Sequence, residues 1–353
     1  MYYFKTLYIF FIVLALNIFF FSTASLKANP FFINEIEISE KLENNFNKNL
    51  LINKGFKKAF DKLTSILVKS KDLEKTKKIK LNEIKAMIDS FSIKEEKFVN
   101  KIYHLNLGVS FNKKKVFNYL EKNNIFPSQI ITETFLFIPI IINQEEDNLL
   151  VFSNNPVYKN WNTKKNKRFL IDFLLPTEDL EDFNVIKEKF PNIENYNFEK
   201  IIEKYFLKHS IVALIFKDSE EIKVLSKIFI KDKKIIKNNS FKNFNLNNEE
   251  KIENLINELK IIYEDIWKSH NQINTSIKLP LLIKIDNKNL DISSKFEKTL
   301  DEIDLINSYS INKFDKDYIF YEVIFNGTTT NFINIMNNKS YNFDTQKKVW
   351  ILK

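Results

Sequence analysis

The chain of 353 residues, 44% of them hydrophobic, is long enough for two or three domains of roughly 100 to 200 residues each. It has a net charge of +9 and no Cys, which excludes disulfide bonds, thiolate nucleophiles, Cys-ligated zinc and a lipid-modified Cys. Only three glycines are present, which excludes phosphate-cradling loops and dinucleotide-binding folds, because both need several glycines at fixed spacing.

The first residues have the composition of an export signal. An apolar run, LYIFFIVLALNIFFF, occupies residues 7–21 and follows the basic Lys5. A membrane-spanning helix needs roughly 20 apolar residues, whereas a cleaved signal needs a basic start, an apolar middle and small residues at the cut. Ala24 and Ala28 offer two cleavage positions, so residues 1–28 are predicted to be a signal peptide and the mature protein to be periplasmic. The alternative is an uncleaved anchor in the inner membrane.

The positive charge is spread along the chain. A basic protein can bind nucleic acid or an acidic membrane. However, Arg168 is the only arginine, and arginine is the residue that most often binds phosphates and the edges of bases. We therefore expect no nucleic-acid partner and no membrane contact beyond an uncleaved first segment. Other envelope proteins are the expected partners.

Residues 29–128 are predicted to form an N-terminal α+β unit. A helix is predicted over 52–67, where Ile52, Phe56, Phe60 and Leu63 share one face. A second helix is predicted to begin after Asn112, a favourable N-cap residue. The other expected elements are a strand over 31–39, a basic connector over 69–80, a short helix over 81–91 and a strand over 101–111.

Residues 129–274 are predicted to form a central α/β layer unit. A long helix with an apolar stripe from Ile252 to Trp267 should cover one face of its sheet, and Glu249 and Glu250 suit the start of that helix. The other expected elements are strands over 134–142, 168–176, 210–218, 222–232 and 233–244 and a short helix over 198–206.

Residues 275–353 are predicted to form a C-terminal unit with the order βαββαβ, the ferredoxin-like arrangement. Its strands are expected over 279–286, 305–311, 318–325 and 347–353, and its helices over 292–303 and 329–336. The predicted fold class is therefore α+β, with three small α/β units.

Two segments are candidate sites. In LPTEDLEDF, Asp179 and Asp182 lie among four acids after a strand, where paired carboxylates can bind a cation or share a proton. The simpler interpretation makes Thr177 an N-cap and places the acids in the first helical turn. In NWNTKKNKR, Trp161 precedes a basic run that could bind a polyanion by charge and stacking, or form an ordinary solvated loop. That run contains Lys164, Lys165, Lys167 and Arg168.

The three histidines, His104, His209 and His270, are predicted to be structural, because no two of them have the spacing of a helical metal site. No serine has the glycine-marked turn of a nucleophile. We expect no cofactor.

The body resembles an uncharacterised proteobacterial envelope family, known as domain of unknown function number two thousand and sixty-six. The resemblance covers residues 31–260. It rests on NEIEIS after the signal, the helix INKGFKKAFDKLTSILV with its Leu63-Thr64 pair, YHLNLGVSF followed by NKKKVFNYLEKNNI, and LPTEDLEDF. The resemblance implies an envelope location and binding to other proteins, and it implies no activity.

Together these features predict an exported, non-enzymatic protein that acts through protein contacts. Two alternatives remain open. One is a periplasmic hydrolase that uses Asp179 and Asp182, and the other is an anion-binding protein that uses the basic run.

Overall fold

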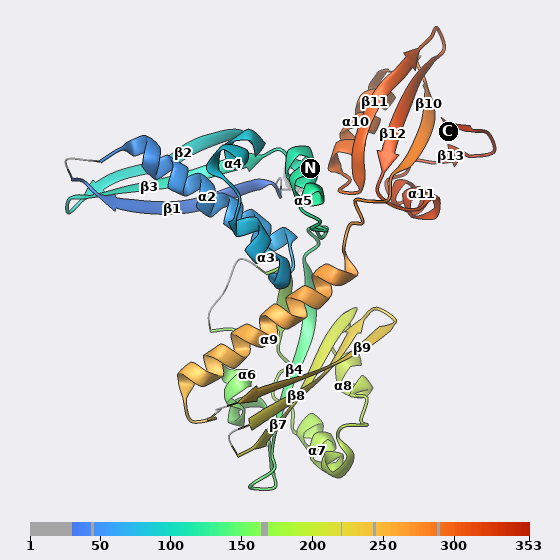
Figure 1. The fold of residues 1–353 in the computed structure, drawn as a ribbon. Coiled ribbons are helices and arrows are strands. Elements are labelled where there is room, and N and C mark those ends of the chain that lie inside the picture. Colours follow the sequence, from blue (N-terminus) through green and yellow to red (C-terminus); the bar gives the residue numbers. More distant parts are fainter. Residues whose placement is uncertain (1–29, 44–45, 164–168, 220, 243–244, 288–289) are drawn as a thin grey trace, which may run out of the picture.

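The computed structural model describes residues 30–353, apart from 44–45, 164–168, 220, 243–244 and 288–289. The predicted signal peptide and the basic run 164–168 therefore lie outside the described residues. Within the described part, the chain forms three sheets of three, six and five strands with helices packed on them (Figure 1). This confirms the α+β class with several small units.

The N-terminal unit is a three-stranded antiparallel sheet in the order β1-β3-β2, with α2 across one face. The predicted long helix is confirmed and begins earlier, because Asn47 caps it through the backbone N–H of Asn49. Gly55 lets α2 lie close to β3, since a Cβ there would lie 2.5 Å from Leu107 Cδ1. The elements are β1 (Phe32–Lys41), α2 (Lys48–Leu67), α3 (Ser70–Lys77), α4 (Leu81–Met87), β2 (Ile88–Val99), β3 (Ile102–Phe111) and α5 (Lys113–Lys122).

Two predictions in this unit were wrong. The connector over 69–80 contains α3, which is supported by ion pairs one turn apart, such as Lys75 with Asp72 at 2.7 Å. The helix predicted over 81–91 ends at Met87, and the chain continues directly as strand β2. The N-cap prediction is confirmed, because Asn112 Oδ1 accepts the N–H of Lys115 at 3.0 Å.

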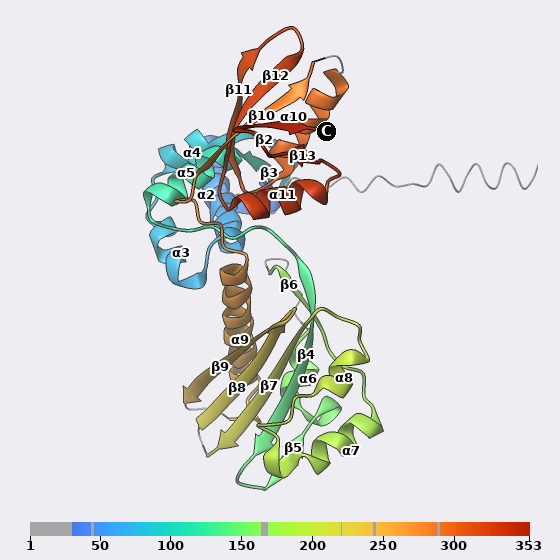
Figure 2. The same ribbon diagram turned by 90° about the vertical axis from the view of Figure 1, so that its right-hand side faces the viewer.

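The central unit has three layers (Figure 2). Helix α9 covers one face of the sheet β5-β4-β7-β8-β9, and α7 and α8 cover the other. Strands β6 and β7 run parallel to β4, and β8 and β9 continue antiparallel. The elements are β4 (Glu133–Asn143), β5 (Asn148–Leu150), η1 (Phe152–Asn154), α6 (Pro156–Asn160), β6 (Ile171–Leu174), α7 (Leu180–Glu188), η2 (Phe190–Asn192), α8 (Glu199–Glu203), β7 (His209–Asp218), β8 (Glu221–Ile230), β9 (Lys233–Lys242) and α9 (Glu249–His270).

The predicted strands over 134–142 and 210–218 and the long helix are confirmed. The strands predicted over 222–232 and 233–244 and the helix predicted over 198–206 also form, and in the described residues they end at Ile230, Lys242 and Glu203. Within its described part, from residue 169 on, the strand predicted over 168–176 is shorter, because Ile171–Leu174 alone pairs with β4. Helix α9 also buries charged side chains that its apolar stripe does not predict. Lys260, Glu264 and Lys268 are 7%, 3% and 4% exposed.

The C-terminal unit has the predicted β-α-β-β-α order, with β12 between β10 and β11 as in ferredoxin-like sheets. It differs at its end. A short extra strand, β13, precedes β14 and forms a hairpin with it, so β14 runs parallel to β10. The elements are β10 (Leu279–Asp286), α10 (Leu290–Glu302), β11 (Ile306–Phe314), β12 (Tyr318–Phe325), α11 (Thr329–Asn337), β13 (Phe343–Asp344) and β14 (Val349–Leu352).

The units are joined by specific contacts. The Ser128 N–H donates to the carbonyl oxygen of Leu67 at 2.7 Å, which ties the first connector to the end of α2. The N-terminal and C-terminal units share one contiguous apolar cluster, and Lys113 forms an ion pair with Asp304 at 3.1 Å between them. Among the described helices, none is both long and apolar enough to cross a membrane.

Candidate interaction surface

Strand β2 lies at the edge of the N-terminal sheet and, among the described strands, pairs only with β3 (Figure 1). It is twelve residues long, and every residue after Ile88 is exposed. Within the described part of the chain, its outer edge makes no backbone hydrogen bond. A row of N–H and C=O groups is therefore available to another strand.

The side chains of β2 alternate between the two faces of the sheet. Phe91, Ile93 and Phe98 lie on the face that carries α2, and they are 47%, 40% and 58% exposed. Four consecutive charged residues, 94–97, separate the two phenylalanines. Lys94 is an extra residue in the ladder, since Ile93 pairs with Leu107 and Glu95 with Asn106. This β-bulge resets the alternation, so even-numbered residues face α2 beyond it.

The α2 side holds β2 in place. Lys48 Nζ lies 2.9 Å from both carboxylate oxygens of Glu96, and the Tyr103 hydroxyl also donates to Glu96. Hydrogen bonds from Tyr103 and then from Lys48 lower the pKa of Glu96. Phe91 packs edge-on against Phe56, with ring centroids 5.1 Å apart. These contacts anchor β2 to α2 and β3 along the side opposite its free edge.

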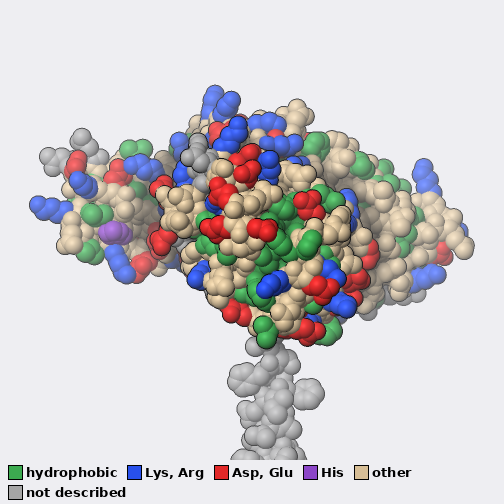
Figure 3. Space-filling view, turned by 90° about the horizontal axis from the view of Figure 1, so that it is seen from below, with side chains coloured by type: hydrophobic (Ala, Val, Ile, Leu, Met, Phe, Trp, Pro, Cys, Tyr) green, Lys and Arg blue, Asp and Glu red, His purple; other side chains and the backbone are tan. Residues whose placement is uncertain are grey.

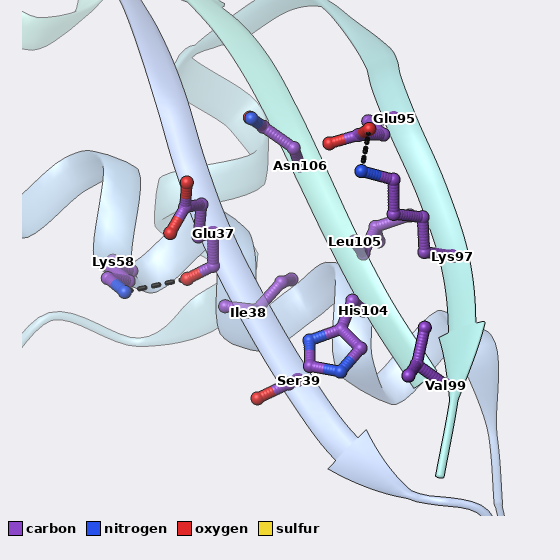
Figure 4. A pocket seen from close by; sticks show the side chains of 10 residues that line it. All are labelled: Glu37, Ile38, Ser39, Lys58, Glu95, Lys97, Val99, His104, Leu105 and Asn106. Carbon is purple, nitrogen blue, oxygen red and sulfur yellow. Dashed lines mark hydrogen bonds and ion pairs between the residues drawn. The ribbon is translucent and has the colours of Figure 1, made fainter. Parts of the chain in front are cut away.

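The sheet face opposite α2 is polar and hollowed, with a volume of about 700 Å³ (Figure 4). Glu95 and Lys97 from β2 form an ion pair there, beside His104 and Asn106 of β3. Lys58 reaches from α2 and donates to the carbonyl oxygen of Glu37 at 2.6 Å. Glu95, Lys97 and Lys58 are thus engaged with neighbouring groups, whereas the side-chain oxygen of Asn106 is buried without a hydrogen-bond partner among the described residues. The hollow gives the sheet a polar, solvent-accessible surface beside β2.

A second hollow of about 860 Å³ lies at the carboxyl ends of β4 and β7, beside the start of α9. Asn143, Asn154 and Asn247 contribute amides to it. Of its two lysines, Lys217 and Lys251, the first is paired with Glu145. It contains none of the residues predicted as sites.

The acidic segment has a structural role. Asp179, and not Thr177, is the N-cap of α7, because its Oδ1 accepts the Glu181 N–H at 2.7 Å. The carboxylates of Asp179 and Asp182 converge on Lys204 Nζ at 3.2 and 2.7 Å. The hydrogen bond from Lys204 is the main cause that lowers the pKa of Asp179. A general acid needs a raised pKa, so the lowered pKa of Asp179 does not suit it for that role.

The surface of the central unit around the start of α7 mixes apolar and acidic side chains. Figure 3 shows hydrophobic side chains gathered there among acidic ones. Leu180, the first residue of α7, is 75% exposed, and Phe206, beyond α8, is 94% exposed. Neither belongs to an unpaired strand.

Trp161 belongs to the core. Its ring is fully buried and stacks on Phe137 with ring centroids 3.8 Å apart. Lys260 Nζ lies 5.2 Å from its ring centroid and donates to its carbonyl oxygen at 2.6 Å. The ring therefore cannot stack on a ligand at the surface. Lys164, Lys165, Lys167 and Arg168 lie outside the described residues.

Two of the three histidines, His209 and His270, pack on the same ring, that of Trp267. His209 is 2% exposed and stacks on Phe135, and His270 stacks on Trp267. His104 is exposed beside the polar hollow. Among the described residues, no group of His, Asp and Glu has the arrangement of a metal site.

Two features were not identified from the sequence. The edge strand β2 was one, although Ser90-Phe91-Ser92-Ile93 has the period-two alternation of a strand. The buried charges Lys260, Glu264 and Lys268 were the other, although their spacing of four places them on one helix face.

No protein-family model matches the sequence, and a search of the curated proteins finds no significant match. The resemblance to the proteobacterial envelope family therefore stays a prediction.

Proposed function

We propose that this is an exported, non-enzymatic protein of the bacterial envelope, which acts by binding polypeptide chains at the free edge of β2. One observation carries the proposal. β2 has twelve residues, one pairing partner and an exposed outer edge with apolar side chains.

Proteins normally keep edge strands short or cover them, because unpaired backbone groups recruit other strands. β2 is about twice the usual strand length of roughly five to six residues. A docked strand would gain main-chain hydrogen bonds, and its side chains would pack against Phe91, Ile93 and Phe98. The four central charges would restrict which strands fit.

Export is supported by the apolar run 7–21 and the small residues after it. The absence of a catalytic role is supported by the engagement of Asp179 and Asp182 with Lys204. Intact mass of the purified protein will give the mature N-terminus.

The proposal is tested by substituting one exposed phenylalanine on β2. C-terminally tagged chains carrying Phe98→Lys or Phe206→Lys are cross-linked in cells and captured beside the unchanged chain. Phe206 is the matched control, because it is more exposed and lies on no strand. We expect Phe98→Lys to lose the cross-linked protein that Phe206→Lys retains. Identical capture by all three chains, with equal stability in urea, would refute a binding role for β2.

A further inference from the structure

We infer that the strand that pairs with β2 is the β2 strand of a second copy of this chain, running antiparallel with Phe91 opposite Phe98. The inference rests on the proposed role of β2 and names its partner. In this register, two paired residue numbers always sum to 189. All ten residues from Ser90 to Val99 then have a partner, and the twofold axis passes between Lys94 and Glu95.

The charges of β2 complement themselves in this register. Lys94 of each copy lies opposite Glu95 of the other, which gives two contacts between opposite charges at the centre. Both side chains are on the sheet face opposite α2, since Lys94 lies over the Phe32 ring and Glu95 pairs with Asn106. Opposite charges in directly facing positions favour pairing.

The apolar side chains also match. Phe91 and Phe98 both lie on the α2 face, so their pairing forms two aromatic contacts on that face, one on each side of the axis. Ile93 lies opposite Glu96, whose carboxylate is already held by Lys48. Ser92 lies opposite Lys97 on the polar face. Every paired position places both side chains on the same face, as an antiparallel ladder requires.

The bulge makes this register unique. A shift by one residue pairs Phe91 with position 97 or 99, whose side chains lie on the opposite face. A shift by two residues in one direction places Lys94 opposite Lys97 and Glu95 opposite Glu96, so like charges meet. A shift by two in the other direction places Phe91 opposite Glu96. The charges and the bulge of β2 would therefore disfavour pairing with other strands but are compatible with pairing to a second β2 in this register.

The dimer would be a continuous six-stranded antiparallel sheet, with both copies of α2 on the same face. In Figure 1, β2 lies along the outside of the N-terminal unit, away from the central unit. The pairing therefore leaves the central sheet of each copy free.

The register is tested by disulfide formation, since the natural chain has no Cys. Full chains carrying Ser92→Cys or Lys97→Cys, with different C-terminal tags, are produced together in cells and oxidised. Facing positions in an antiparallel pair have Cα atoms about 4.5 to 5.5 Å apart, within the range a disulfide accepts. Two copies of position 92 would lie roughly 16 Å apart at about 3.3 Å per residue.

We expect a disulfide between a Ser92→Cys chain and a Lys97→Cys chain, and none between two Ser92→Cys chains. A chain with Ser240→Cys, on the edge strand β9, is the control for random collision and should not react with Ser92→Cys. The inference would be overturned if all three combinations of Cys positions (92 with 97, 92 with 92, and 92 with 240) formed the disulfide equally, or if none of them formed it.

Charge exchange gives an independent result. Lys94→Glu or Glu95→Lys should each abolish co-purification of the two tagged copies, and the double variant Lys94→Glu/Glu95→Lys should restore it. Failure of the double variant to restore co-purification would contradict the register. If two copies never associate while Phe98→Lys still abolishes capture of another protein, the proposed function stands with a different partner. If Phe98→Lys also changes nothing, both proposals fail.

Discussion

The ammonium group of Lys268, in the last turn of α9, donates to the carbonyl oxygen of Ser65 in α2 at 2.6 Å, across 203 positions of sequence. It also donates to the Val68 carbonyl oxygen at 3.1 Å and lies 3.9 Å from Glu264. The end of α2 in the N-terminal unit is therefore capped by a buried lysine of the central unit. Burial lowers the pKa of Lys268 and raises that of Glu264.

We predict that Lys268→Met lowers the free energy of unfolding by about 3–5 kcal/mol, because it leaves a buried charge and two carbonyl groups without their partner. Urea unfolding measures the loss. Lys251→Met, at an exposed position on the same helix, should change little. Adding Glu264→Gln to Lys268→Met should recover part of the loss. If the loss of unfolding free energy in the double variant equals the sum of the losses in Lys268→Met and Glu264→Gln, the two side chains are not coupled.

Asp179 is predicted to act as a helix cap. Asp179→Ala should destabilise the protein more than Asp179→Asn, because asparagine retains the capping oxygen while both variants lose the ion pair with Lys204. Thermal unfolding distinguishes the two. If the variants are equally stable, capping is not what Asp179 contributes.

Trp161 is predicted to stabilise the central core. Trp161→Ala should cost about 3–5 kcal/mol of unfolding free energy, because it removes a fully buried ring from the cluster around Phe137. Trp161→Phe should cost less, since it keeps part of the aromatic packing. A near-neutral Trp161→Ala variant would show that the ring is not buried in solution.

His209 is predicted to make stability depend on pH. Burial lowers the pKa of His209, so the unfolded chain binds a proton first as the pH falls. Stability contributed by the neutral ring is thus complete above about pH 6.5 and declines below it. Urea unfolding at pH 7.5 and 5.5 should show a smaller difference for His209→Gln than for the unchanged chain. His104→Gln, at an exposed position, serves as the control and should behave like the unchanged chain.

The sequence predicts the elements whose apolar residues keep one uninterrupted period. Helix α2, helix α9 and strand β4 are of this kind, and all three form as expected. Strand β2 was missed because its bulge at Lys94 moves the apolar positions from odd to even numbers, which hides the alternation. The other features that the sequence did not predict depend on contacts between residues far apart in the chain.

The N-cap of α7 is set by one such long-range contact. Thr177 and Asp179 are both suitable caps, but the hydroxyl of Tyr205 accepts the Thr177 N–H, and the helix begins two residues later. Likewise, Lys268 is buried only because the end of α2 lies against α9. Neither neighbour can be inferred from local spacing.

The central claim is that the edge of β2 binds protein in the cell. Its most direct test places a photoreactive amino acid at position 92 on β2 and, in a separate chain, at position 240 on β9. Both natural residues are exposed serines on edge strands. Illumination of living cells should give a discrete cross-linked product from position 92 and none from position 240, with the mass of a dimer if the partner is a second copy. Cross-linking from position 240 but not from position 92 would contradict the account.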